Sequence, residues 1–404
     1  MTVAVADAFR DWLACAVAGT DSRAVRAAAA TADDVTVLGT AGHVLDFDDT
    51  YGPGLAHLSA AVAPAALALA AQQDAPVGAL LDAYAAGVEA MAALTAASHP
   101  ALYDGGWHPT AVGGVLGAAV AAAALLGADA RAAGALALLR AGGLRAAFGS
   151  DGKALQVGLA AADGVRAAQL AAAGATVGAS AVERGAAGFE EAFGATFAST
   201  AESERPSAFD ELWIKAYPCC LQTHGAIECA VEAAGRGVTL AGPRLRTVTI
   251  VVHPVSRRAA ALDDVTDGLA AKFSIPYCTA FALRHGRAPA RLEDFAVVDG
   301  GVRADARRVR VVTDETLLQS EAVLVHETAS GEIEVARVEA ALGSPQQPMS
   351  GEQLGEKVRA LTGARLDGLL DDPARPATDV LAVVLDAAAQ AGAGPRGAAA
   401  PVPS

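Results

Sequence analysis

The stretch AVGGVLGAAVAAAALL, residues 111–126, is the longest apolar run in the sequence. It carries no charge, but Gly and Ala supply most of its side chains, so it is only weakly hydrophobic. A membrane span needs about 20 strongly apolar residues. We therefore predict a buried helix over 111–126, with the Thr110 hydroxyl accepting from its first free backbone amides. Such small side chains favour close approach of neighbouring helices.

Helical periodicity extends on both sides of this run, up to about residue 210. Apolar residues recur at the spacing of a helix face, and strand-like alternation is missing from this half of the sequence. Beside 111–126, helices are predicted over 5–18, 59–71, 77–94, 128–139 and 158–173. We expect residues 1–210 to form one large all-helical domain.

The pattern changes after residue 210. Residues 245–253 alternate and are rich in β-branched side chains, which is typical of a strand. Further strands are predicted over 308–313, 322–328 and 332–338, the last two as a hairpin, and helices over 224–234, 272–284, 351–361 and 377–391. The sequence thus predicts an α+β fold, with a smaller α+β domain over 211–345. The C-terminal helices (346–391) are expected to return partly to the helical domain, and the tail (392–404) to be disordered.

The charge balance limits the class of partner. A net charge of −15 argues against nucleic acid, which requires clustered cations, and against an anionic membrane surface. The five cysteines form no CxxC pair, so a zinc site is not expected and a reducing compartment fits. The sequence starts without a basic segment and apolar run, so we expect no signal peptide and a cytoplasmic protein.

Lysine is rare in this chain. Of 30 basic residues only four are lysines, Lys153, Lys215, Lys272 and Lys357, and the others are arginines. Either chance kept these lysines, or they stand where a compact, titratable ammonium is required. An acidic protein that binds an anion must gather its few cations in one pocket.

An acidic cluster follows in the segment His43-Val44-Leu45-Asp46-Phe47-Asp48-Asp49-Thr50. Carboxylates this close repel one another, so they need cations or their pKa values rise. One interpretation is an acid–base or substrate-orienting loop. The other is a helix N-terminus stabilised by acids. Binding of Mg²⁺ beside phosphates is disfavoured, because no basic phosphate-binding stretch accompanies the acids.

Two histidines stand where helices are predicted to start. His57 precedes the 59–71 helix, and His108 lies in the motif Trp107-His108-Pro109-Thr110. An anionic substrate would settle near the free amides of a helix start. Each histidine, taken alone, is equally compatible with a structural role.

Two later segments are rich in reactive side chains. Residues 213–224 contain Lys215, Cys220 and His224, and a Cys220–His224 thiolate pair is conceivable but lacks a third, orienting group. Residues 272–277 contain Tyr277, which is either a general acid or hydrogen-bond donor, or a core aromatic.

The order of these motifs resembles the MmgE/PrpD family. The pattern H-x-x-DFDDT, a histidine about seven residues on, WHPT, GKALQVG, IKxYPCCxxxH and KFSxxY extends over roughly residues 8–360. That family includes 2-methylcitrate dehydratase, cis-aconitate decarboxylase and iminodisuccinate epimerase. The resemblance implies a large helical domain with a smaller α/β lid domain, an active site between them, and a homodimer.

The resemblance also implies roles for individual residues. Asp46, His57, His108 and Tyr277 are expected to be catalytic. Substrate binding is expected of Thr50, Lys153, Lys215, Cys220 and His224. Lys272 is expected to be structural, and neither a metal nor a cofactor is expected.

The implied activity is a cofactor-independent lyase acting on a di- or tricarboxylate, foremost dehydration of a 2-methylcitrate-like hydroxy acid. Decarboxylation, epimerisation and a catalytically silent carboxylate-binding role are the alternatives. Gly152, Gln156 and Cys220 depart from residues common in the family, which leaves the substrate open and allows a specialised biosynthetic one.

Overall fold

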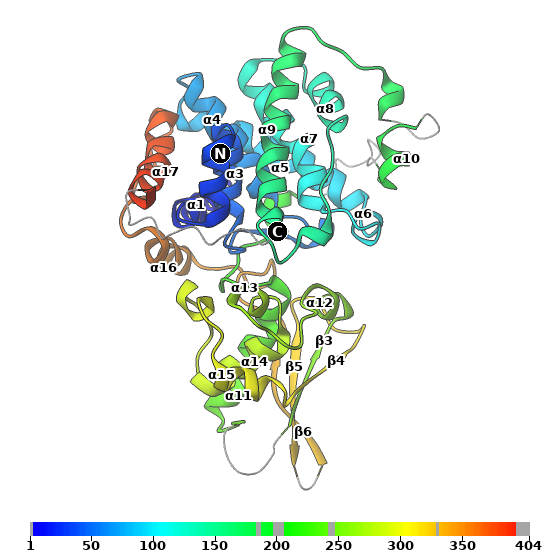
Figure 1. Cartoon of the computed structure of the whole chain (residues 1–404), viewed down its shortest axis with the longest axis vertical. Helices are drawn as coiled ribbons and strands as arrows, with labels where there is room; N and C mark the ends of the chain where they lie inside the picture. The colour runs from blue at the N-terminus through cyan, green and yellow to red at the C-terminus, as the bar shows by residue number, and fades with distance from the viewer. Residues whose placement is uncertain (1–2, 183–186, 197–205, 241–246, 329–330, 393–404) are drawn as a thin grey trace, which may run out of the picture. The chain divides into compact units, whose positions relative to one another are not determined.

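The apolar run 111–126 forms most of α7 (Pro109–Leu126), about which the first of two structural units is packed (Figure 1). The computed structural model describes residues 3–182, 187–196, 206–240, 247–328 and 331–392. One unit comprises residues up to 212 and from 352 onward, and the other comprises residues 213–351. The short β2 (Leu212–Trp213) lies at the division.

The first unit is built of helices. Beside α7 they are α1 (Val3–Gly19), α2 (Arg23–Thr31), α3 (Asp34–His43), α4 (Leu58–Gln72), α5 (Val77–Ala97), α6 (Ala101–Asp104), α8 (Ala130–Leu138), α9 (Gly152–Ala172), α10 (Phe189–Phe193), α16 (Gly351–Thr362) and α17 (Ala377–Gly392). The sequence does not predict α3, since its Val, Thr and Gly residues are weak helix formers. The Asp33 carboxylate caps this helix by accepting from Thr36 N–H, and α9 packs against it.

Glycines allow α7 to approach its neighbours closely. A Cβ on Gly114 would lie 2.5 Å from the Ala61 Cβ of α4, and one on Gly117 would lie 2.8 Å from the Gly87 carbonyl oxygen of α5. Neither contact leaves room for a methyl group. The Gly and Ala content of the run is therefore used to pack helix backbones together, as predicted.

Two predicted helix starts are wrong. His108 is the N-cap of α7 and Pro109 its first residue, so Thr110 lies inside the first turn. Its hydroxyl accepts instead from His57 N–H at 3.0 Å, which links the starts of α4 and α7. The α9 helix begins at Gly152 rather than at 158, and this brings Lys153 into its first turn.

The second unit contains a four-stranded sheet of order β4-β3-β5-β6. Its strands are β3 (Val248–Val252), β4 (Val309–Thr313), β5 (Ala322–Thr328) and β6 (Gly331–Val338). β3 pairs parallel with β4 and antiparallel with β5, which pairs antiparallel with β6. The predicted strands are confirmed, although the first part of 245–253 and residues 329–330 of the hairpin loop lie outside the described residues.

Helices pack against this sheet, so the predicted α+β class holds (Figure 1). They include α11 (His224–Gly235) and α14 (Ile275–His285). The second unit also contains the short helices α12 (Pro254–Ala259), α13 (Gly268–Ala271) and α15 (Gly300–Ala306). Lys272 does not begin a helix as predicted. It is the C-cap of α13, and the Ser274 side chain caps α14.

The C-terminal helices belong to the first unit. Val77 N–H donates to the Arg375 carbonyl at 2.8 Å, and Ala377 N–H donates to the Ala75 carbonyl at 2.9 Å, so the chain before α17 is joined to the start of α5. The predicted disorder of the tail concerns residues that, from 393 onward, lie outside the described ranges.

Two helices, α5 and α7, are long and apolar enough to cross a membrane by length and composition. Most of each lies buried against neighbouring helices, 56% of the apolar window in α5 and 78% in α7. Burial inside the protein is what a core helix shows, in agreement with the prediction for 111–126.

We predict that Gly117→Ala lowers the free energy of unfolding by about 1–3 kcal/mol, because the methyl group would overlap the Gly87 carbonyl and the Val62 side chain. The matched control is Gly142→Ala, at a position with open space around the new Cβ. Urea unfolding of both variants measures the effect. Equal stability of the two would refute the close-packing role of Gly117.

Candidate functional site

The acidic segment joins the end of α3 to β1 (Thr50–Tyr51). His43 is the last residue of α3, and Asp46 adopts a left-handed backbone conformation with φ of 54°. The interpretation as a helix N-terminus is therefore wrong. The segment is a buried turn, and the side chains of Asp48 and Asp49 are fully shielded from solvent.

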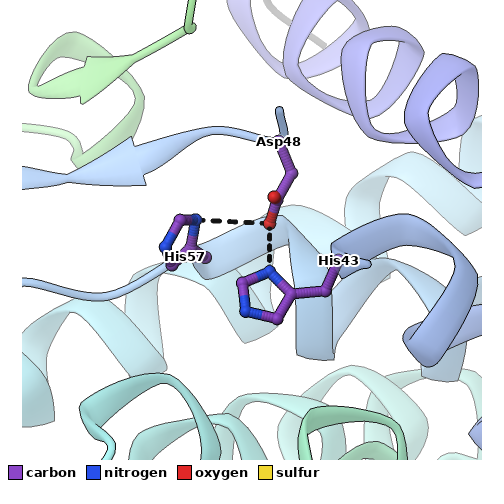
Figure 2. A group of neighbouring side chains, drawn as sticks. All are labelled: His43, Asp48 and His57. Atoms are coloured by element: carbon purple, nitrogen blue, oxygen red, sulfur yellow. Dashed lines mark hydrogen bonds and ion pairs between the residues drawn. The ribbon is translucent and has the colours of Figure 1, made fainter. Parts of the chain in front are cut away.

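Asp48 lies between two imidazoles (Figure 2). Its Oδ2 is 2.8 Å from His43 Nδ1 and 3.3 Å from His57 Nδ1. Burial alone would raise the pKa of Asp48, but the attraction of His43 and His57 and their hydrogen bonds outweigh it and hold the pKa well below its usual value. Asp48 is thus a carboxylate, and both Nδ1 atoms are the donors.

The two imidazoles differ in their access to solvent. The His43 side chain is fully buried, whereas 12% of the His57 side chain is exposed. His57 is the N-cap of α4 and makes no side-chain capping bond. Because Nδ1 faces the Asp48 carboxylate, the neutral form of His57 would carry its proton on Nδ1 and its lone pair on Nε2. This is the geometry that a general base requires.

His108, the N-cap of α7, completes a group of three imidazoles. The His43 ring centroid lies 4.6 Å from that of His57 and 5.9 Å from that of His108. The Phe148 ring contacts His108 edge-on at 4.9 Å. Burial, followed by the electrostatic influence of His43 and Lys153, holds the pKa of His108 well below its usual value, so His108 is a neutral imidazole.

Asp46 forms a buried ion pair with Lys153, whose Nζ is 2.5 Å from Asp46 Oδ1. Lys153 Nζ also lies 5.3 Å from the centroid of the Phe148 ring, the ring that contacts His108. The lysine predicted to hold a substrate carboxylate is therefore close to the imidazole group. Asp48, which the sequence interpretation did not single out, is the acid that contacts the histidines.

A second lysine fixes the other side of the turn. Lys357 of α16 places its Nζ 2.6 Å from Asp11 Oδ1, 2.9 Å from the Phe47 carbonyl oxygen and 4.0 Å from the Phe47 ring centroid. No local pattern connects Lys357 with the acidic segment, because 310 residues separate Lys357 from Phe47.

Asp49 points away from the imidazoles into the core. Its carboxylate oxygens accept from Ser59 N–H at 3.3 and 3.4 Å, and the Ser59 hydroxyl lies 2.5 Å from the Tyr84 hydroxyl. Burial, then the neighbouring Asp48 charge, raises the pKa of Asp49 to about 7. The two adjacent acids therefore differ: Asp48 is ionised at neutral pH, whereas Asp49 is largely protonated below about pH 7.

The remaining predicted site residues divide between the units. Thr50 is buried and lies in the first unit, which also contains Asp46, His57, His108 and Lys153. The other four lie in the second unit: Lys215, Cys220, His224 and Tyr277. All four are buried.

Within the second unit, the Tyr277 hydroxyl accepts from Asp299 N–H at 3.0 Å, as a core aromatic would. The His224 ring packs against Tyr217 at a centroid distance of 4.9 Å. Burial would raise the pKa of Cys219, but hydrogen bonds with Cys278 and His224 outweigh it and lower that pKa. His224 therefore influences the neighbouring thiol Cys219.

The ligand atoms of His43, Asp48 and His57 lie within 4.8 Å of one another, a spacing that permits a metal ion. The shared acceptor Asp48 Oδ2 accounts for the same spacing through hydrogen bonds. The donor set of two imidazoles and one carboxylate suits a transition metal such as zinc, with one position left open.

Clustered imidazoles beside a carboxylate and a buried lysine are typical of enzymes that move protons. Family models identify the class further: the MmgE/PrpD N-terminal domain matches residues 33–200, and the MmgE/PrpD C-terminal domain matches residues 217–371. The chain therefore belongs to the MmgE/PrpD family, whose members are generally enzymes such as dehydratases and isomerases. No curated protein matches the sequence.

We predict that Asp49→Asn alters how stability depends on pH. Between the unfolded pKa near 3.8 and the folded pKa of about 7, the folded protein keeps a proton that the unfolded chain has lost, so this group costs stability as pH rises. Asparagine does not titrate, so the variant does not lose stability in this way as pH rises. Its stability relative to wild type is expected to increase by up to about 1.4 kcal/mol per pH unit from pH 4 to 7 and to level off above.

Urea unfolding at pH 5, 6, 7 and 8 measures this difference, with the exposed Asp82→Asn on α5 as the control. A difference between Asp49→Asn and wild type that stays constant across this range would contradict the protonation assigned to Asp49.

Proposed function

We propose that this protein is a cofactor-independent lyase acting on a di- or tricarboxylate, foremost by removing water from a 2-methylcitrate-like hydroxy acid. One observation carries the proposal. The buried Asp48 carboxylate orients the imidazole of His57, and the buried ammonium of Lys153 lies in the same unit. Family membership supports a dehydratase-type lyase or a related enzyme.

The proposed reaction begins with a proton on the carbon next to a substrate carboxylate. That proton passes to an imidazole nitrogen, and the electron pair left on carbon spreads into the carboxylate. A fixed cation such as Lys153 stabilises this developing charge more than it stabilises the ground state. The C–O bond then breaks as the double bond forms, and the hydroxyl takes up a proton and leaves as water. The site gains one proton and loses one.

Other parts of the proposal rest on the family resemblance. We propose substrate binding by Thr50, Lys215, Cys220 and His224, and a catalytic role for Asp46 and Tyr277. We further propose a cytoplasmic homodimer that binds neither nucleic acid nor membranes, in keeping with the net charge of −15.

Decarboxylation and epimerisation are the alternatives within this chemistry. Epimerisation starts from the same proton abstraction, but the proton returns to the opposite face of the carbon. Decarboxylation reaches a similar carbanion by loss of CO₂ and ends by protonating it. An oriented imidazole and a lysine could serve dehydration, epimerisation and decarboxylation alike. The products of the reaction therefore distinguish the three.

The experiment is incubation with a panel of di- and tricarboxylates in D₂O, following water loss, CO₂ release and deuterium on carbon. Water loss from a hydroxy acid supports the proposal. Release of CO₂, or deuterium incorporation with inversion, selects one of the alternatives. Neither turnover nor binding of any carboxylate would refute the proposal. Equal rates with a chelator and with added zinc are expected of a cofactor-independent enzyme.

We predict that Lys153→Met raises KM for the carboxylate at least about tenfold, because it removes a buried charge that would pair with the substrate. The control is Arg23→Met, which removes a cation beside the same helix start but from a side chain that is 81% exposed. Steady-state kinetics of both variants decide the point. Unchanged KM and kcat in a folded Lys153→Met variant would exclude Lys153 from the substrate site.

A further inference from the structure

The side-chain amide of Gln156, on α9, is fixed by the backbone of one residue. Leu144 N–H donates to Gln156 Oε1 at 2.9 Å, and Gln156 Nε2 donates to the Leu144 carbonyl at 3.2 Å. Rotating the amide by 180° would set NH₂ against N–H and one oxygen against another. Both hydrogen bonds would become repulsions, so the position of oxygen and nitrogen is determined.

The backbone that holds this amide also holds His108. Leu144 forms a β-bridge with Trp107, and His108 N–H donates to the Gly143 carbonyl at 3.0 Å. The imidazole and the amide are therefore attached to the same short pairing of chain segments.

Gln156 Nε2 lies 2.6 Å from Nδ1 of His108. An amide nitrogen donates hydrogen bonds and does not accept them. Nδ1 must consequently be the acceptor, and the proton of the neutral ring must be on Nε2. An imidazolium would direct Nδ1–H at the NH₂ group and lose this hydrogen bond. Only 2% of His108 is exposed, so water has little access to replace the lost partner of Nδ1.

His57 has the opposite arrangement. Its Nδ1 faces the Asp48 carboxylate at 3.3 Å, so the neutral ring would carry its proton on Nδ1 and its lone pair on Nε2. The two histidines at the starts of α4 and α7 thus present different groups at Nε2, a lone pair on His57 and an N–H on His108.

We propose that Gln156 locks His108 as the Nε2–H tautomer, so that His108 donates a hydrogen bond to a substrate oxygen while His57 takes the carbon-bound proton. The roles of His57 and His108 toward the substrate rest on the proposed function, whereas the tautomer of His108 does not. Neutral imidazole as a donor suits an oxygen that gains charge in the transition state, because the donor needs no proton from solvent beforehand.

The test is ¹H–¹⁵N correlation NMR of the full-length protein labelled at its eight histidines, with His108→Gln used to assign the ring. The expected result is protonated Nε2 and unprotonated Nδ1 on His108, without substrate present. Protonated Nδ1 in the wild-type protein would overturn the proposal, whether or not any carboxylate is turned over. If His108 has the predicted tautomer but no carboxylate is turned over, the role of Gln156 in setting the tautomer holds and the proposed function is refuted instead.

A substitution of Gln156 tests whether this residue sets the tautomer of His108. Gln156→Glu keeps the size of the side chain but offers Nδ1 a carboxylate acceptor, so a proton is expected on Nδ1 and kcat is expected to fall at least about tenfold, with a smaller change in KM. Gln169→Glu, which adds the same charge on the exposed face of α9, is the control and should change neither. If Gln156→Glu does not fold, Gln156→Met replaces it, with both neutral tautomers of His108 expected. An unchanged tautomer in either folded variant would show that Gln156 does not set it.

Discussion

A single buried carboxylate organises this site. Removing an ion of the size of Asp48 from water costs several kcal/mol unless partners compensate, and here the partners are two imidazoles 2.8 and 3.3 Å away. One comes from the last residue of α3 and the other from the N-cap of α4. The interaction that makes the buried charge tolerable is therefore also the one that orients His57. The same contacts therefore stabilise the turn and orient the imidazole that we propose as the base.

Two lysines from distant parts of the chain hold the same turn. Lys153 of α9 pairs with Asp46, and Lys357 of α16 binds the Phe47 carbonyl and Asp11. The C-terminal helix α16 thus helps to position the acidic turn, although the two are far apart in sequence. In a chain with four lysines, two are used as compact buried cations around one turn. Removing either would leave a buried carboxylate uncompensated, so both matter to folding.

Much of the fold could be predicted from sequence, because periodicity and small-residue content are local properties. The α7 helix and the strands of the second unit illustrate this, and the order of the motifs identified the family. The role of Asp48 could not be predicted. Three acids stand within four positions, and which of them faces the imidazoles depends on the left-handed backbone at Asp46. Thr110 was misassigned for a similar reason, since the identity of the cap depends on a contact with His57.

The central claim is that Asp48 orients His57 to remove a proton from carbon next to a carboxylate. It is tested most directly by Asp48→Asn, which keeps the shape of the side chain but removes its charge. The measurement is the rate of deuterium exchange into a bound carboxylate in D₂O, beside its binding affinity. The account predicts an exchange rate reduced by about 100-fold or more, with the carboxylate still bound. Exchange at the wild-type rate in a folded Asp48→Asn protein would contradict it.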